Sequence, residues 1–178
     1  MPATEHIDKE EEVLDQTTGR DHRIDVNSRS SNRQYYNSRD DMESYVWSVA
    51  YNASNNDYIL YLRNTNPDKD LYITSVDVGS KLKSIFSLSR VTGLGSGADS
   101  SEVNLNLKSS NEALAVHLGG DVGDIGTATM IDCRTNDAYS GSKFEFNGSL
   151  ILGEGDAIAI KAEENPSSTC ASITGFFE

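Results

Sequence analysis

From residue 43 onward, apolar and polar side chains alternate along the chain with a period of two. Tyr45, Trp47 and Tyr51 fall on one side of the first such stretch, and Val103 and Leu105 fall on one side of a later one. Successive side chains of a strand point to opposite faces, so this alternation predicts strands with one buried face. Trp47, in phase with its apolar neighbours, is expected in the core.

Nine further stretches are short, apolar or alternating, and bounded by Gly, Asn, Asp or Pro, as closely spaced strands are. They are residues 58–63, 71–78, 84–91, 113–118, 127–132, 143–146, 149–152, 157–162 and 169–177. No amphipathic helical window lies between them, so the chain lacks the crossover helices that a parallel sheet needs. The pattern predicts an all-β fold, an antiparallel β-sandwich of jelly-roll type with an extended N-terminal arm.

The connections fit such a sandwich. Pro67, preceded by Asn66, suits a type I turn, so residues 64–70 are expected to join two strands as a hairpin. Residues 93–101 and 119–126 are rich in Gly, Asp and Ser and predict longer, flexible links at the rim. Neither has the spacing of a phosphate-binding loop.

The composition changes near residue 41. Residues 2–41 contain ten acidic and six basic side chains and only scattered apolar ones. Such a segment buries too little surface to offset the entropy of ordering its backbone, so it is expected to be disordered in isolation. At most it holds one short helix over residues 5–16. The chain therefore divides into an irregular arm, residues 1–41, and a sandwich domain, residues 42–178.

The arm is expected to bind other subunits. Fully extended, forty residues reach roughly 130 Å, far beyond the radius of one domain of this size. The adjacent tyrosines at positions 35 and 36 suit an apolar anchor in a partner pocket. The predicted partner-binding residues are the larger apolar side chains of the arm: Ile7, Val13, Leu14, Ile24, Val26, Tyr35 and Tyr36.

The length and net charge of the chain limit the classes of partner that it can have. The 178 residues suffice for one domain with a core, and 28 acidic against 15 basic side chains give a net charge of −13. That charge repels a phosphate backbone, so no nucleic-acid partner is expected. No stretch approaches the roughly 20 apolar residues of a membrane span, and residues 1–25 lack the pattern of a secretory signal. No membrane partner is expected either.

The two cysteines, Cys133 and Cys170, both fall in strand-like segments. Two thiols make neither a disulfide-rich scaffold nor a four-ligand zinc site. We expect buried thiols, and a single bridge between neighbouring strands is the alternative.

No catalytic, cofactor or metal residue is predicted. His117 is the only histidine after the arm, and without a Gly-x-Ser-x-Gly elbow it is expected at the surface or bonded to a loop carbonyl. Alternating oxygens at Asn64, Asn66, Asp68 and Asp70 resemble a calcium loop but lack its glycine and distant Glu, and Asp121 with Asp124 is a weaker candidate. Paired carboxylates of glycosidase type, drawn from Glu102, Glu145 and Asp156, remain open.

Four strand-like segments carry a resemblance to known proteins. Residues 58–64, 71–76, 103–109 and 150–160 together resemble jelly-roll structural proteins in the virions of tailed bacteriophages, particularly those that decorate or cement the head. The resemblance covers about residues 43–178 and leaves the arm without a counterpart. It implies a non-enzymatic particle component, often trimeric, that binds the major capsid protein or other virion subunits.

The resulting expectation is a homo-oligomeric virion protein that is made in the host cytoplasm and ends on the phage particle surface. Its arm lies along neighbouring subunits and its sandwich forms a knob. An alternative is a phage tail or fibre component, or another carbohydrate-binding β-sandwich, that recognises host-surface glycans. That alternative predicts exposed aromatic side chains beside acidic or amide groups in one loop cluster.

Overall fold

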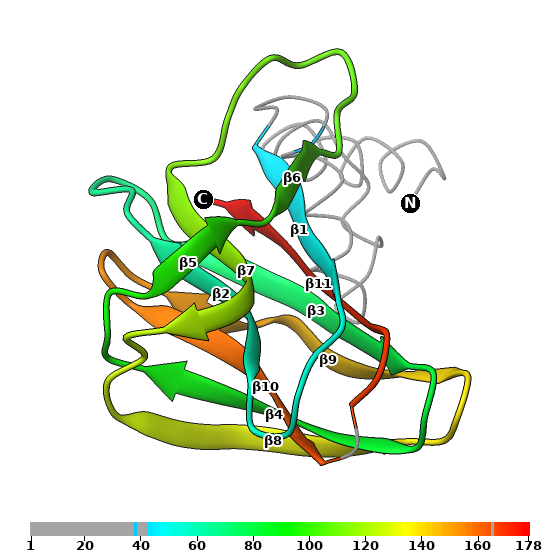
Figure 1. Cartoon of the computed structure of the whole chain (residues 1–178). Helices are drawn as coiled ribbons and strands as arrows, with labels where there is room; N and C mark the ends of the chain where they lie inside the picture. Colours follow the sequence, from blue (N-terminus) through cyan, green and yellow to red (C-terminus); the bar gives the residue numbers. More distant parts are fainter. Residues whose placement is uncertain (1–37, 39–42, 165) are drawn as a thin grey trace, which may run out of the picture.

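The computed structural model describes residues 38, 43–164 and 166–178. The predicted arm, apart from Ser38, and the helix over residues 5–16 lie outside these residues. Eleven strands make up the described part (Figure 1): β1 (Ser44–Tyr51), β2 (Tyr58–Asn64), β3 (Leu71–Ser80), β4 (Ser84–Val91), β5 (Ser96–Asp99), β6 (Ser101–Asn104), β7 (Ala115–Gly123), β8 (Ala128–Asn136), β9 (Ser140–Leu152), β10 (Ala157–Glu164) and β11 (Thr169–Phe177).

The strands form two sheets in which every paired neighbour is antiparallel. The five-stranded sheet has the order β6-β1-β11-β3-β9, and the six-stranded sheet has the order β5-β7-β2-β10-β4-β8. Consecutive strands β1 and β2, and again β2 and β3, belong to different sheets. The prediction of an all-β antiparallel sandwich is confirmed. The predicted hairpin at residues 64–70 is wrong, because this loop carries the chain from one sheet to the other.

Element boundaries depart from the predictions where the backbone is irregular. Residues 143–146 and 149–152, predicted as two strands, belong to the single strand β9, whose register on β3 shifts near Ile73. Asn147 and Gly148 lie between the two parts, with φ of 50° and 78°. The link predicted over residues 93–101 contains β5, and β7 extends into the link predicted over residues 119–126.

The main core lies between the two sheets and consists of alternate residues of both. Trp47 has no exposed surface, which confirms its predicted place in the core. Its ring stacks on that of Tyr45 with 5.7 Å between centroids, and Tyr45 meets Phe177 edge-on at 6.0 Å. Each such side chain contributes roughly 1.5–3 kcal/mol through burial. This core fixes β1 and β11 side by side, which places the start of the sandwich next to its end.

A second, smaller core covers the outer face of the six-stranded sheet. Tyr61, Leu118 and Ile125 are among its buried residues. The Tyr61 hydroxyl donates to the Gly93 carbonyl oxygen at 3.0 Å, and the Gly93 amide donates to the carbonyl oxygen of Ile125 at 2.7 Å. A Cβ at Gly93 would lie 1.8 Å from the Asp124 carbonyl oxygen, so this close approach of two loops requires glycine.

We predict a loss of stability at alkaline pH that depends on Tyr45. Burial, followed by the carboxylates of Glu43 and Glu102, raises the pKa of Tyr45 from 10.0 to about 12. As the pH rises, the unfolded chain therefore releases the proton of the Tyr45 hydroxyl before the folded chain does. The stability that this protonated tyrosine contributes is complete below pH 10 and is lost as the pH rises towards 12. Between pH 9 and pH 11, the free energy of unfolding of the intact chain should fall by on the order of 1 kcal/mol more than that of Tyr45→Phe. Urea unfolding of both proteins at the two pH values measures this difference. Equal losses in the two proteins would contradict this.

Candidate functional site

The two ends of the described body meet at one end of the sandwich. The Phe177 amide donates to the Glu43 carbonyl oxygen at 3.1 Å, and Asp70 and Glu178 exchange two backbone hydrogen bonds of 3.1 Å. In Figure 1 the C-terminus lies beside the start of β1. The backbone that leads from the arm into β1 is therefore fixed next to the C-terminus. We name this end of the sandwich, made of Glu43, Glu178 and loops 64–70, 104–114 and 152–156, the arm pole.

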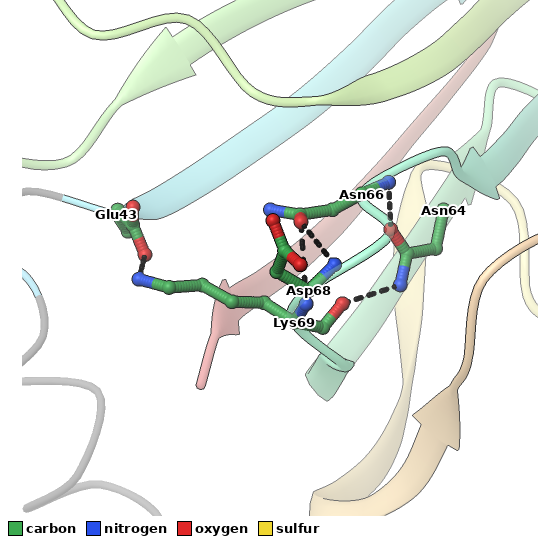
Figure 2. Close-up of polar contacts among 5 residues, drawn as sticks. All are labelled: Glu43, Asn64, Asn66, Asp68 and Lys69. Carbon is green, nitrogen blue, oxygen red and sulfur yellow. Dashed lines mark hydrogen bonds and ion pairs between the residues drawn. The ribbon is translucent and has the colours of Figure 1, made fainter.

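A buried side-chain amide, that of Asn64, organises the arm pole. Asn64 has no exposed surface. Its Nδ2 donates to the carbonyl oxygens of Lys69 at 2.9 Å and Leu152 at 2.8 Å, and its Oδ1 accepts from the Asn66 amide at 2.8 Å. Its own backbone exchanges bonds with loop 152–156, through Asp156 and Gly155. One side chain thus joins the end of β2 to the end of β9 and to the loop between β2 and β3. Figure 2 shows its bonds to Asn66 and Lys69 in that loop.

Asn66 completes the loop in the same way. Its Oδ1 accepts from the amides of Asp68 at 2.9 Å and Lys69 at 3.2 Å. Both asparagines thus use their side-chain oxygens on backbone N–H groups, the behaviour that favours Asn in turns. Two of the four oxygens considered for a calcium loop, those of Asn64 and Asn66, are therefore occupied by the fold itself. Within residues 43–164 and 166–178, no group of three or more His, Cys, Asp or Glu residues is placed to hold a metal ion.

An ion pair joins this loop to the beginning of β1. The Lys69 ammonium group reaches the Glu43 carboxylate across the arm pole, as Figure 2 shows. The side chains are 38% and 25% exposed, so solvent weakens the pair to about 1 kcal/mol or less. Its consequence is geometric: Glu43 is held by its backbone through Phe177 and by its side chain through Lys69.

Exposed apolar side chains gather in one segment that includes loop 104–114 of the arm pole. Of the eleven large hydrophobic residues exposed in the described part, five lie between residues 103 and 116: Val103, Leu105, Leu107, Leu114 and Val116. The loop within this segment stands out from the body between β6 and β7 (Figure 1). It is tied to the pole by bonds from the Leu105 amide to the Ser44 carbonyl oxygen at 2.7 Å and from the Thr65 amide to that of Leu114 at 3.0 Å.

The same loop contacts the one described residue of the arm. Asn106 Nδ2 donates to the Ser38 carbonyl oxygen at 2.8 Å. Concentrated exposed apolar surface is typical of interaction sites. The arm pole thus combines the origin of the arm with the segment of the described chain that is richest in exposed apolar residues.

A second polar cluster, which the sequence did not predict, joins β6 of the five-stranded sheet to β7 of the six-stranded sheet. His117 Nε2 lies 3.2 Å from Glu102 Oε2, and Ser100 Oγ lies 3.1 Å from His117 Nδ1. Glu102 also accepts from Trp47 Nε1 at 3.0 Å and from the Ala113 amide at 2.9 Å. The ring of His117, expected at the surface or on a loop carbonyl, is instead held between a hydroxyl and a carboxylate.

Serine, histidine and glutamate are the groups of a nucleophilic triad, but their surroundings favour a structural role. The Ser100 amide donates to the His117 carbonyl oxygen at 3.2 Å, so it is not available to stabilise an oxyanion. The Glu102 carboxylate is shared among three donors. A Cβ at Gly119 would lie 3.1 Å from that of Ser100, so β7 packs closely behind the serine. We interpret the cluster as a polar staple between the sheets.

The remaining carboxylates that were considered for glycosidase chemistry have separate partners. Glu145 lies 3.3 Å from the Lys143 ammonium, and Asp156 pairs with Arg90 at 2.8 Å. Glu102 belongs to the staple. Asp121 and Asp124, the weaker calcium candidates, are both exposed.

The prediction of buried thiols is wrong. Cys133 and Cys170 are both free and exposed, so the alternative of a bridge between them is also excluded. Cys170 lies on the outer face of the five-stranded sheet, between Ala50 and Gly79 in register, and Cys133 lies on the edge strand β8. A strand-like sequence does not reveal which face a residue occupies or whether its strand lies at an edge.

An open concavity of about 830 Å³ lies on the outer face of the five-stranded sheet. Small residues line it, among them Ser48, Gly79 and Ser172, together with the charged side chains of Asp77 and Lys143. No aromatic side chain takes part in this lining.

The seven partner-binding residues predicted in the arm, Ile7, Val13, Leu14, Ile24, Val26, Tyr35 and Tyr36, lie outside the described residues. No helix in the described part is long and apolar enough to cross a membrane. A scan against protein-family models, a search of curated proteins and a search of solved structures each found no match.

We predict that Asn64→Ala destabilises the fold by about 2–4 kcal/mol, because the carbonyl oxygens of Lys69 and Leu152 and the Asn66 amide lose their partner. Thr65→Ala, at an exposed neighbouring position whose backbone bond to Leu114 is retained, is the matched control and should change stability by less than about 0.5 kcal/mol. Urea unfolding of both variants measures the difference. Equal stability of the Asn64 variant and the intact chain would contradict the role of this amide.

The staple gives a separate prediction. Glu102→Ala leaves the Trp47, Ala113 and His117 donors without their acceptor and should cost about 2–4 kcal/mol, whereas Ser100→Ala should cost about 1 kcal/mol or less. Hydrolysis of p-nitrophenyl acetate should be equally slow with the intact chain and with Ser100→Ala. A rate that falls to the buffer level only in the serine variant would instead identify a catalytic triad.

Proposed function

We propose that the protein is a non-enzymatic virion structural protein that decorates or cements a phage capsid through its arm and its sandwich. The observation that carries the proposal is the construction of the arm pole. There the backbone leading from the arm is fixed by Phe177 and Lys69, next to a loop that exposes Leu105, Leu107 and Leu114. A tether rooted in a hydrogen-bonded body beside apolar surface suits attachment to a larger assembly.

The strand order supports a jelly-roll topology for the body. Strands β1-β11-β3-β9 of one sheet and β2-β10-β4-β8 of the other are the two groups of four that successive Greek keys produce. In this proposal β5, β6 and β7 are an insertion between β4 and β8 that widens both sheets on one side. Jelly rolls occur in viral capsid proteins and also in lectins, so the topology is compatible with both functions considered for this chain.

Charge supports binding of the arm to neighbouring subunits. Residues 20–39 contain five arginines and two aspartates, whereas residues 43–178 contain eighteen acidic and nine basic side chains. The basic part of one arm therefore complements the acidic body of the next copy or of another virion subunit. Many copies, each with an arm on a neighbour, multiply modest affinities through effective concentration. We propose homo-oligomeric assembly on the major capsid protein, with the particle surface as the final location.

The glycan-binding alternative receives less support from the described residues. Tyr139, 78% exposed, is the only aromatic among the large hydrophobic residues that are exposed there. Trp47 is buried, and the concavity on the five-stranded sheet has no aromatic lining for a sugar to stack on.

Removal of residues 2–41 tests the proposed function. Particles are purified on density gradients from cells carrying the phage whose genome encodes the chain, with either the intact or the shortened chain expressed under an epitope tag. The intact chain should sediment with the particles, and the shortened chain should remain at the top of the gradient because its tether is gone.

Thermal unfolding of the shortened chain is the control for folding. A folded, shortened chain that sediments with particles as fully as the intact chain would contradict attachment through the arm. Absence of the intact chain from the particles would contradict the virion function itself.

A further inference from the structure

The edge strand β8 is exposed on both of its faces. It is the last strand of the six-stranded sheet, has nine residues, and pairs only with β4. Seven of these residues are exposed, including Met130 at 58% and Ile131 at 39%. The opposite edge of the same sheet, β5, has only four residues. A long exposed edge with apolar side chains is a template for pairing with another strand.

The second half of β8 is regular enough to pair. The register on β4 shifts at Ile131, between the pairs Leu88–Asp132 and Ser89–Met130, and from Asp132 to Asn136 it runs without interruption. Asp132 and Arg134 are opposite Leu88 and Phe86, which face the core, so both charged side chains lie on the inner face. Cys133, between them, lies on the outer face.

We propose that β8 pairs antiparallel with β8 of a second copy of this chain, about a two-fold axis at Cys133. Residues directly opposite each other in an antiparallel pair have their side chains on the same face of the sheet, whereas neighbouring residues of one strand have theirs on opposite faces. An axis between two neighbouring residues would place these two opposite each other, so the axis must pass through a residue. An axis at Asp132 opposes two carboxylates, and an axis at Arg134 opposes two guanidinium groups. Only an axis at Cys133 opposes Asp132 of each copy to Arg134 of the other, which gives two complementary pairs.

Existing contacts position both charged groups for this arrangement. Arg134 lies 2.8 Å from Asp132 and 5.5 Å above the ring of Phe144, which holds the guanidinium group at the edge. The Cys133 amide donates to Asp132 Oδ1 at 2.7 Å. In the pair this amide donates to the Cys133 carbonyl oxygen of the second copy, and Asp132 remains between the two arginines. Asp132 and Arg134, which make the β8 edge of a single copy polar, thereby specify the register of the pair.

This pairing also brings the two Cys133 thiols together on one face. Opposite residues of a hydrogen-bonded antiparallel pair have Cα atoms about 5.5 Å apart, within the roughly 4.4–6.8 Å that a disulfide spans. The proposal does not depend on the virion function, because it concerns contacts between copies and not attachment to a particle.

Oxidative cross-linking of the full chain tests the position of the axis. Copper phenanthroline, which removes two electrons and two protons from two thiols, should convert the intact chain and Cys170→Ser to a covalent dimer but form no covalent dimer of Cys133→Ser. Peptide mapping should identify Cys133 joined to Cys133. If the edge instead binds a strand of the arm, or if the linkage joins Cys133 to Cys170, this cross-link does not form and the proposal fails.

Charge reversal tests the register without any covalent bond. Asp132→Arg and Arg134→Asp should each weaken self-association by about tenfold, because each creates two like-charge pairs. The double variant D132R/R134D restores both opposite-charge pairs and should recover the affinity of the intact chain. Sedimentation equilibrium under reducing conditions at about 100 µM measures the association.

Thermal unfolding of the same variants shows whether each remains folded. A monomeric intact chain at this concentration, or a folded double variant that associates no better than the single ones, would overturn the proposal.

Discussion

The arm pole depends on one buried amide. Asn64 donates to carbonyl oxygens of Lys69 and Leu152 and accepts from the Asn66 amide, so it satisfies backbone groups from three segments that meet where the sheets end. Buried backbone groups without partners are costly, and no apolar residue could replace these bonds. With loop 64–70 held in this way, Asp70 pairs with Glu178 and Lys69 reaches Glu43. The position of Glu43, at the start of the described body, follows from this loop.

In the proposed function, the arm starts from a fixed point at Glu43 and binds neighbouring subunits through many weak contacts. Asn64 and Asn66 at the arm pole and the three side chains of the staple are engaged in bonds within the fold. The described residues offer a partner apolar surface near Leu107, an exposed strand edge at β8 and an acidic body, and the sequence of the arm adds the arginines of residues 20–39. Such features suit assembly, in which many modest interactions act together.

Alternation along the sequence was sufficient to predict most of the strands, because a period of two follows directly from strand geometry. Residues 84–91 and 169–177 match β4 and β11, and Trp47 is buried as its phase indicates. The strand β5, with the sequence Ser-Gly-Ala-Asp, carries no apolar alternation and forms only because β7 offers it a partner. Residues 143–146 and 149–152 were predicted as two strands, whereas the structure accommodates Asn147 and Gly148 through a register shift within the single strand β9.

The other features that the sequence did not reveal depend on residues that are distant in sequence and meet only in the folded chain. Ser100, Glu102 and His117 come together because β6 of one sheet meets β7 of the other, and no local motif marks such a meeting. The exposure of Cys133 depends on β8 being an edge strand, which is a property of strand order. The hairpin expected at Pro67 was wrong for the same reason: a turn sequence indicates a reversal of the chain but not the sheet that it enters.

The central claim is that the arm pole is the surface by which the protein joins its assembly. Hydrogen exchange measured by mass spectrometry, on the free chain and on the chain bound to purified particles, tests it most directly. Binding should slow amide exchange in residues 1–41 and 103–116 and leave β3 and β11, beneath the outer concavity, unchanged. Slower exchange around that concavity, with residues 103–116 unaffected, would contradict the account.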